Sequence, residues 1–582
     1  MKHWIILAVI LLMAAAALVV GERRNAEAEV SPAPILYFVA DTERELTRVP
    51  VSLTRISDKE EIAVGDEMAR GYLEVSKKGD TPEDRTIASY VSRVGTKVTE
   101  NAHRKLPYRF HYLSDDYLVN AFALPGGHVF IGKGLLNLMD SEDELASVLG
   151  HEVEHIELGH CAERVQIEAR LNKLPMVISV AGLPIEIFQA GYSKEQELEA
   201  DREGTKLAVA AGYSAEGSIR MFQRFEKLEA EWQRYEVRRR QQPGVVELPA
   251  DIANAVVLQT LEGYFRSHPP EQERIAQIER LIATEHWPKD QKQQPLQVGY
   301  LLLTDEAAAF LARDEVDKAL AKVNEALAMK SDYVPALNLL GDVNFERANF
   351  AAAADAYRQS LALEPKQEAI AARYASSLAA SLPAQEAAAR YAEWLRSAPP
   401  SAPALDWFMV EEAGLKLLSG DVAAAKTLEQ SLSKSENTDA PLVQARLGWW
   451  YYRANNAQVA ADLIGLAVEQ RPQIGSLSAK LGWALAAQKK YESAQQRFYA
   501  AGNGGGRDGR AEAQMGLAVT AWEAKEPELA LTNYRAAVLE RAAWGNPRWV
   551  AALYGEPVVA SVQAIRQENE KRRKDKGAVP RQ

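Results

Sequence analysis

Cysteine is almost absent from this chain of 582 residues, since Cys161 is the only one. A single thiol excludes an internal disulfide and a cysteine-rich metal site, and its position excludes a lipid-modified N-terminal cysteine. We interpret Cys161 as a small buried hydrophobic residue. Positive charge is also in deficit, because 68 Lys and Arg stand against 80 Asp and Glu for a net charge of −12. This balance argues against nucleic acid as a partner.

Long apolar runs are missing from most of the chain. Trp4–Val20 is an unbroken run of 17 apolar residues, whereas Met176–Ile187 is short and interrupted by Pro184 and Glu186. The lack of several spanning segments argues against an intramembrane enzyme. The first run predicts that residues 1–28 are either a signal peptide or a retained inner-membrane anchor, with a buried soluble helix as the alternative.

Histidine is scarce too, with nine residues, but two of them form the motif His151-Glu-Val-Glu-His155. Each residue of an α-helix advances by about 100°, so residues at i and i+4 lie on one face. This spacing allows His151 and His155 to bind one Zn²⁺, with Glu152 beside a metal-bound water. A surface helix with two ordinary histidines is the alternative. Ser141 and Glu144 form a capping box that predicts the start of this helix.

A catalytic zinc site usually needs a third protein ligand. His160 is excluded on a continuing helix, because it would lie about 140° away from His155. Glu197 is the better candidate, since it shares a helix face with Asp201 four residues later. One of these carboxylates can bind the metal, while the other accepts the second N–H of a ligating histidine. A solvated acidic helix face is the alternative.

Two short β-strands precede the motif. Residues 119–123 and 128–131 flank Leu124-Pro-Gly-Gly127, which predicts a hairpin. The open edge of such a strand can pair with an extended peptide and lay it across the metal. We therefore predict a substrate-binding edge strand, with a plain core hairpin as the alternative, and its residues are Asn120, Ala121, Phe122 and Ala123.

These pieces together resemble metallopeptidase family 48, the gluzincins that include HtpX-like, CAAX-protease-like and BepA-like branches. The resemblance covers roughly residues 56–285. Four motifs in the same order carry it, which makes it specific. They are Asn120–Gly127, Asp143–Ala146 leading into Gly150–His155, Glu197–Asp201, and Ser267–Pro270 followed by Arg274-Ile275.

The resemblance implies one Zn²⁺ per chain, held by His151, His155 and Glu197. It implies that Glu152 is the general base and that Asp201 supports the ligands from behind.

Two further residues match the family's pattern after the zinc ligands. His268 corresponds to a histidine that, in the BepA-like branch, can bind the zinc as a regulatory fourth ligand or move aside. A helix-start residue before Pro269 is the alternative reading of His268. Arg274 corresponds to a catalytic residue that helps to orient this region or the oxyanion.

From about residue 300 the sequence becomes rich in alanine and repeats every 34 residues, which is typical of TPR helix pairs. In the clearest unit, 334–367, Gly341 and Tyr357 occupy repeat positions 8 and 24. We count about seven units. Stacked units form a solenoid whose concave surface can dock proteins, although a purely structural extension is the alternative. The basic tail Gln567–Gln582 is predicted to be disordered.

The expected fold is an α+β gluzincin domain with a small β-hairpin or sheet, followed by an all-α TPR solenoid. The expected segments are 1–28, a linker at 29–55, the peptidase domain at 56–290, the TPR domain at 297–545, and a C-terminal helix and basic tail at 546–582.

The expected function is that of an exported, periplasmic zinc endopeptidase, soluble or anchored to the inner membrane. It would act on unfolded or misassembled envelope proteins in quality control and dock substrates or outer-membrane assembly machinery through its TPRs. The alternative is a chaperone-like TPR interaction protein with a mostly latent protease.

Overall fold

A computed structural model describes residues 56–76, 81–116, 118–171, 192–241, 271–397, 405–434, 439–502 and 506–575. The predicted leader at 1–28, the linker at 29–55 and His268 lie outside the described residues. In the described part of the chain, no helix has both the length and the apolar character needed to cross a membrane. The chain divides into two compact units, Met1–Gly299 and Tyr300–Gln582.

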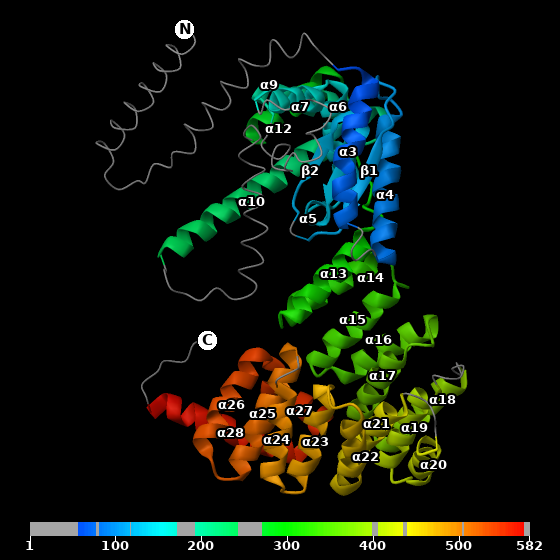
Figure 1. The fold of residues 1–582 in the computed structure, drawn as a ribbon, viewed down its shortest axis with the longest axis vertical. Coiled ribbons are helices and arrows are strands. Elements are labelled where there is room, and N and C mark those ends of the chain that lie inside the picture. Colours follow the sequence, from blue (N-terminus) through cyan, green and yellow to red (C-terminus); the bar gives the residue numbers. More distant parts are fainter. Residues whose placement is uncertain are drawn as a thin grey trace. The chain divides into compact units, whose positions relative to one another are not determined.

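Helices surround a small sheet in the first unit, which confirms the predicted α+β class (Figure 1). Its elements are α3 (Asp58–Ser76), α4 (Pro82–Thr99), β1 (Arg109–Leu113), β2 (Ala121–Leu124), β3 (His128–Gly132), α5 (Lys133–Leu136), α6 (Glu142–Glu157), α7 (His160–Leu171), α9 (Lys194–Ala210), α10 (Glu216–Gln241) and α12 (Glu271–Thr284).

The described strands lie in the order β1-β3-β2, so that β2 forms one edge. β2 and β3 pair antiparallel, as the hairpin prediction requires, and β1 joins β3 in parallel. The turn Pro125–Gly127 is a 3₁₀ helix in which Gly126 has a φ of 77°. A Cβ on Gly126 would lie 2.5 Å from the Cα of Ile62, so this turn packs directly against α3.

The two helices that carry the candidate site begin at side-chain caps. At the start of α6, the Ser141 hydroxyl accepts the Glu144 amide at 3.3 Å. The Glu144 carboxylate binds the amide of Asp140 at 2.7 Å, rather than the amide of Ser141 that a capping box would use. At the start of α9, Ser193 and Gln196 form the complete box that the sequence predicts. The caps make both helices well-defined supports for side chains.

α6 and α9 cross at two glycines, Gly150 and Gly204. A Cβ on Gly204 would lie 2.6 Å from the backbone nitrogen of His151, and a Cβ on Gly150 would lie 2.6 Å from the carbonyl oxygen of Gly204. Real Cβ atoms do not approach backbone so closely, so the absence of side chains at these two positions sets the distance between the helices.

We expect Gly204→Ala to lower the free energy of unfolding of the first unit by about 1–3 kcal/mol, because the methyl group must push α9 away from α6. Amide hydrogen exchange in α6 and α9 will measure the effect. The matched control is Gly71→Ala in α3, where a Cβ meets nothing within 4 Å. It should stabilise its helix by about 0.5–1 kcal/mol. Equal exchange in both variants would refute the close crossing.

Helix pairs make up the second unit. Among the described residues they number seven, from α13–α14 to α25–α26, followed by α27 and α28. The repeat geometry confirms the predicted TPR solenoid. A Cβ on Gly341 would lie 2.2 Å from the ring of Tyr357, which is why repeat position 8 is glycine. The bounds are α13 (Gly299–Ala312), α14 (Val316–Met329), α15 (Val334–Glu346), α16 (Phe350–Leu363), α17 (Glu368–Ser381), α18 (Ala384–Ser397), α19 (Leu405–Leu418), α20 (Ala423–Leu432), α21 (Ala440–Arg453), α22 (Ala457–Gln470), α23 (Gly475–Ala487), α24 (Tyr491–Gly502), α25 (Arg507–Glu523), α26 (Pro527–Glu540), α27 (Pro547–Tyr554) and α28 (Glu556–Asp575).

The prediction of a disordered tail from Gln567 is wrong as far as Asp575, where α28 ends. Ile565 and the valines before it lie in the core of the second unit and anchor this helix. Arg572 ties the helix to α26 through an ion pair with Glu528 and forms a second ion pair with Glu568 within α28. The composition from Gln567 onward indicates only a polar segment. The apolar first half of α28, which precedes Gln567, holds the whole helix in place.

Candidate metal centre

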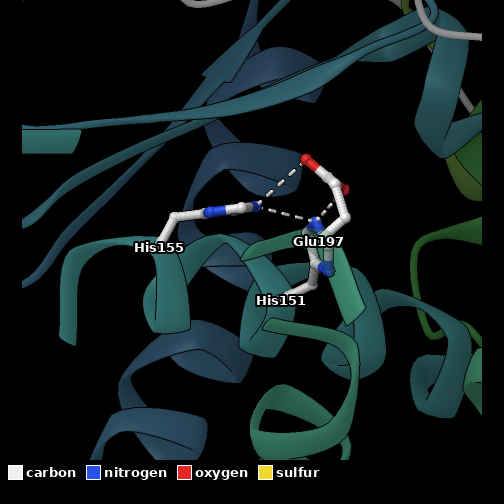
Figure 2. Close-up of side chains that lie close together, drawn as sticks. All are labelled: His151, His155 and Glu197. Carbon is white, nitrogen blue, oxygen red and sulfur yellow. Dashed lines mark hydrogen bonds and ion pairs between the residues drawn. The ribbon is translucent and has the colours of Figure 1, made fainter. Parts of the chain in front are cut away.

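Three potential metal ligands converge between α6 and α9 (Figure 2). The Nε2 atoms of His151 and His155 lie 3.1 Å apart. The Glu197 carboxylate faces both rings, with Oε2 at 3.5 Å from His151 Nε2 and Oε1 at 3.7 Å from His155 Nε2. The structure therefore places together the three residues that the sequence nominates as ligands, although Glu197 comes from a separate helix.

The three side chains fit a zinc ion by spacing and by chemistry. A tetrahedral ion with Zn–N bonds near 2.05 Å needs ligand atoms about 3.3 Å apart, which the three measured separations bracket. The site also favours positive charge. Burial alone would lower the pKa of His151, but hydrogen bonds with Asp201 and Glu197 outweigh it and raise the pKa to about 10. Two imidazoles and one carboxylate are a common set for catalytic zinc.

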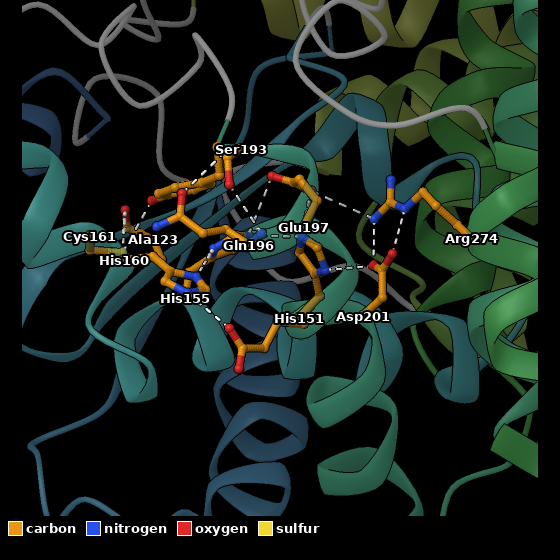
Figure 3. A network of polar contacts seen from close by, with 12 residues as sticks. Ala123, His151, His155, His160, Cys161, Ser193, Gln196, Glu197, Asp201 and Arg274 are labelled. Carbon is orange, nitrogen blue, oxygen red and sulfur yellow. Dashed lines mark hydrogen bonds and ion pairs between the residues drawn. The ribbon is translucent and has the colours of Figure 1, made fainter. Parts of the chain in front are cut away.

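Asp201 holds His151 from behind the centre (Figure 3). His151 Nδ1 lies 2.9 Å from Asp201 Oδ1, which leaves Nε2 facing the other two ligands. Arg274, from α12, grips the same carboxylate through Nε at 2.7 Å and a terminal nitrogen at 2.6 Å. Burial raises the pKa of Asp201, but the charge of Arg274 outweighs this and keeps the pKa below its usual value. Asp201 therefore stays ionised.

Arg274 is itself fixed in the interior. Its side chain is 1% exposed, its guanidinium lies 4.2 Å above the ring of Phe222, and its terminal nitrogen reaches within 4.0 Å of Glu197 Oε2. The guanidinium is thus engaged with the support of the ligands, and its position favours an orienting role over direct contact with an oxyanion.

Glu152 lies next to His151 on α6 and is 7% exposed. Burial raises the pKa of its carboxyl to about 7, and the backbone of Ala123 donates a hydrogen bond to it. A carboxyl with this pKa can exchange protons near neutral pH. A small cavity of about 20 Å³ adjoins it, lined by the aromatic rings of Phe222 and Phe225 on one part and by the charged side chains of Asp201 and Arg274 on another.

The predicted substrate strand is β2 together with Asn120, whose carbonyl accepts the amide of Gly132. One side of β2 pairs with β3, and among the described strands none pairs with its other side. All four residues of β2 are nevertheless buried, and the Ala123 carbonyl accepts the Cys161 thiol at 3.6 Å. Through the hydrogen bond described above, Ala123 connects this edge of the sheet to Glu152, the neighbour of the candidate ligand His151.

Sequence reasoning missed two side chains that surround His155. Tyr192 stacks on its ring with centroids 3.8 Å apart, and His160 Nδ1 lies 3.1 Å from its Nδ1. A tyrosine two residues before the start of α9 is a weak signal. The sequence spacing places His160 on a continuing helix away from His155, and only the turn at Gly159 brings it behind that ring.

Comparison with known proteins agrees with this geometry. Residues 86–282 match the model of peptidase family M48. The beta-barrel assembly-enhancing protease of Yersinia pestis is 27% identical over 186 residues, which are 28% of this chain and 38% of that protein. Its Escherichia coli K12 counterpart is 27% identical over 175 residues, covering 26% and 36%. The mitochondrial metalloendopeptidase OMA1 of Schizosaccharomyces pombe is 29% identical over 212 residues, covering 34% and 61%.

These matches have a limited span. The chain matches less than two-fifths of the length of the two bacterial relatives. Among solved structures, a tetratricopeptide repeat protein from Parabacteroides merdae covers 46% of this chain and 99% of its own, at 14% identity and a TM-score of 0.29. The repeat assignment rests on the 34-residue spacing and the helix pairs.

Proposed function

Residues 86–282 belong to peptidase family M48, and from this premise we propose that the chain is an exported zinc-dependent endopeptidase. Its substrates would be unfolded or misassembled proteins of a bacterial envelope. The observation that carries this proposal is the buried meeting point of His151, His155 and Glu197, with Glu152 beside it. The TPR unit would dock substrates or an outer-membrane assembly machine.

The residues divide the work of peptide hydrolysis. Zinc, when bound by His151, His155 and Glu197, would polarise the carbonyl of the cleaved peptide bond and lower the pKa of the attacking water. Glu152 takes the proton of the attacking water and delivers it to the leaving amine, a task that suits a carboxyl with a pKa of about 7. Asp201 holds the proton of His151 at Nδ1, so that Nε2 stays available to the metal.

The substrate chain would bind as an additional strand along β2. Backbone hydrogen bonds of this kind need no particular side chains, which suits an enzyme that acts on varied unfolded proteins. The amide of Ala123 is already bonded to Glu152 and its carbonyl to the Cys161 thiol, so a substrate chain would pair with the other residues of this edge and pass close to the general base at Ala123.

The apolar segment Trp4–Val20 and the similarity to two beta-barrel assembly-enhancing proteases of bacteria support the cellular setting. We propose a periplasmic location, with the leader either cleaved or kept as an inner-membrane anchor. The TPR unit has the architecture of a protein-docking solenoid, which supports protein partners.

The alternative proposal is a chaperone-like TPR protein in which His268 occupies the metal and keeps the protease latent. It rests on the match of His268 to the regulatory histidine of the BepA-like branch. His268 lies outside the described residues, so the distinction is an experimental one.

We expect the purified full chain to contain one zinc per molecule and to cleave an unfolded outer-membrane protein, and a chelator to abolish cleavage. If His268 restrains the enzyme, His268→Ala should cleave faster than the wild type. Cleavage is followed by gel electrophoresis and zinc by elemental analysis. Persistent binding of the unfolded protein without cleavage by the wild type or by His268→Ala would favour the chaperone-like alternative.

A further inference from the structure

His160 stands directly behind one of the metal ligands. It is 4% exposed, and its Nδ1 lies 3.1 Å from Nδ1 of His155. The opposite nitrogen of His155, Nε2, is the atom that faces His151 and Glu197. His160 thus contacts the ring edge that points away from the ligand cluster.

A break between helices brings His160 to this place. α6 ends at Glu157, and Gly159 adopts a φ of 76°, which favours glycine. α7 then begins at His160 itself. On an uninterrupted helix His160 would lie about 140° away from His155, whereas the turn at Gly159 folds it back onto the ring.

When Nε2 of His155 binds a metal, the positions of the protons on the two imidazole rings follow from this contact. The ring must then be neutral with its proton on Nδ1, and this N–H needs an acceptor. Nδ1 of His160 is 3.1 Å away and can accept only if His160 carries its own proton on Nε2. That second N–H points toward Glu199, whose Oε2 lies 3.8 Å from His160 Nε2.

We propose that His160 is a positioning residue for His155. It accepts the Nδ1 proton of His155 and so stabilises the form of this ring in which Nε2 binds the zinc. The inference rests on the proposed zinc function. Tyr192 already restrains the face of the His155 ring by stacking, at an interplanar angle of 18°. Stacking leaves open which nitrogen carries the proton, and the acceptor at His160 Nδ1 stabilises the form with the proton on Nδ1 once Nε2 binds a metal.

The two metal-binding histidines are therefore supported differently. His151 donates to the ionised carboxylate of Asp201, which Arg274 holds in place. His155 donates to a neutral imidazole that is backed by a carboxylate, Glu199, whose side chain is 43% exposed. An imidazole is a weaker acceptor than a carboxylate, so His155 is the less strongly polarised of the two ligands.

The test compares two variants of the full chain. His160→Phe keeps the ring size and removes the acceptor, whereas His160→Asn keeps an acceptor close to the position of Nδ1. Zinc affinity is measured by competition with a chromophoric chelator, and Co²⁺ absorption reports the geometry of the ligands. We expect His160→Phe to bind zinc about 10–100-fold more weakly than the wild type, and His160→Asn to recover most of that loss.

Thermal unfolding of the metal-free proteins separates a role of His160 in zinc binding from a role in packing the core. The acceptor for the His155 proton is needed only when a metal occupies Nε2. We expect metal-free His160→Phe to melt close to the wild type. Unchanged zinc affinity in His160→Phe, or equal loss in both variants, would overturn the role of His160 alone. A wild-type chain that binds no zinc would instead overturn the proposed function, and this inference with it.

Discussion

Glu152→Gln is expected to lower kcat for peptide hydrolysis by about 10²–10⁴-fold while one zinc per chain remains bound. The amide has nearly the shape of the carboxyl group but cannot accept a proton from water at neutral pH. Glu152 is not one of the three convergent ligands, so the metal affinity should change little. Initial rates on an unfolded outer-membrane protein and the zinc content of the same samples provide the two measurements.

Glu154→Gln is the matched control for this variant. Glu154 lies on the same helix and is also buried at 4% exposed, and burial raises the pKa of its carboxyl to about 8. The carboxylates of Glu157, Glu203 and Glu199 act on it more strongly than the ligand His151 does, and it is not one of the three convergent ligands, so its neutral amide should leave hydrolysis near the wild-type rate. Normal cleavage by Glu152→Gln would remove Glu152 from the role of general base.

Arg274→Met is expected to destabilise the α9–α12 region by about 3–5 kcal/mol, since it leaves the buried carboxylate of Asp201 without its cationic partner. The methionine keeps much of the apolar contact with Phe222. Zinc affinity should also fall by about 10–100-fold, because Asp201 no longer holds His151 in one orientation. Hydrogen exchange of peptides from α9 and α12 measures the first effect, and chelator competition measures the second.

The double variant Arg274→Met with Asp201→Leu separates the cost of a buried unpaired charge from the loss of the hydrogen bond that orients His151. With both charges removed, protection of α9 and α12 should recover much of the loss, since no unpaired ion stays buried. Zinc affinity should stay low, because His151 Nδ1 has lost the acceptor at 2.9 Å. Unchanged protection in Arg274→Met would show that this ion pair does not stabilise the region.

Local patterns in the sequence predicted most of the elements. The spacing of His151 and His155, the cap at Ser193 and the Pro-Gly-Gly turn each depend on residues a few positions apart, and the helices and hairpin appear where these patterns place them. The 34-residue period predicted the helix pairs in the same way. The tail prediction failed because composition describes polarity and not the apolar anchor near Ile565.

By itself, the sequence determined which side chains could make a metal site, which helix presents two of them, and that a repeat solenoid follows. Only the tertiary structure decided how the His151–His155 pair meets Glu197, because this depends on a helix crossing that Gly150 and Gly204 permit. It also decided the supports: Arg274 reaches Asp201 across 73 residues, and the turn at Gly159 places His160 behind His155. Such contacts depend on packing between distant segments, which no local spacing encodes.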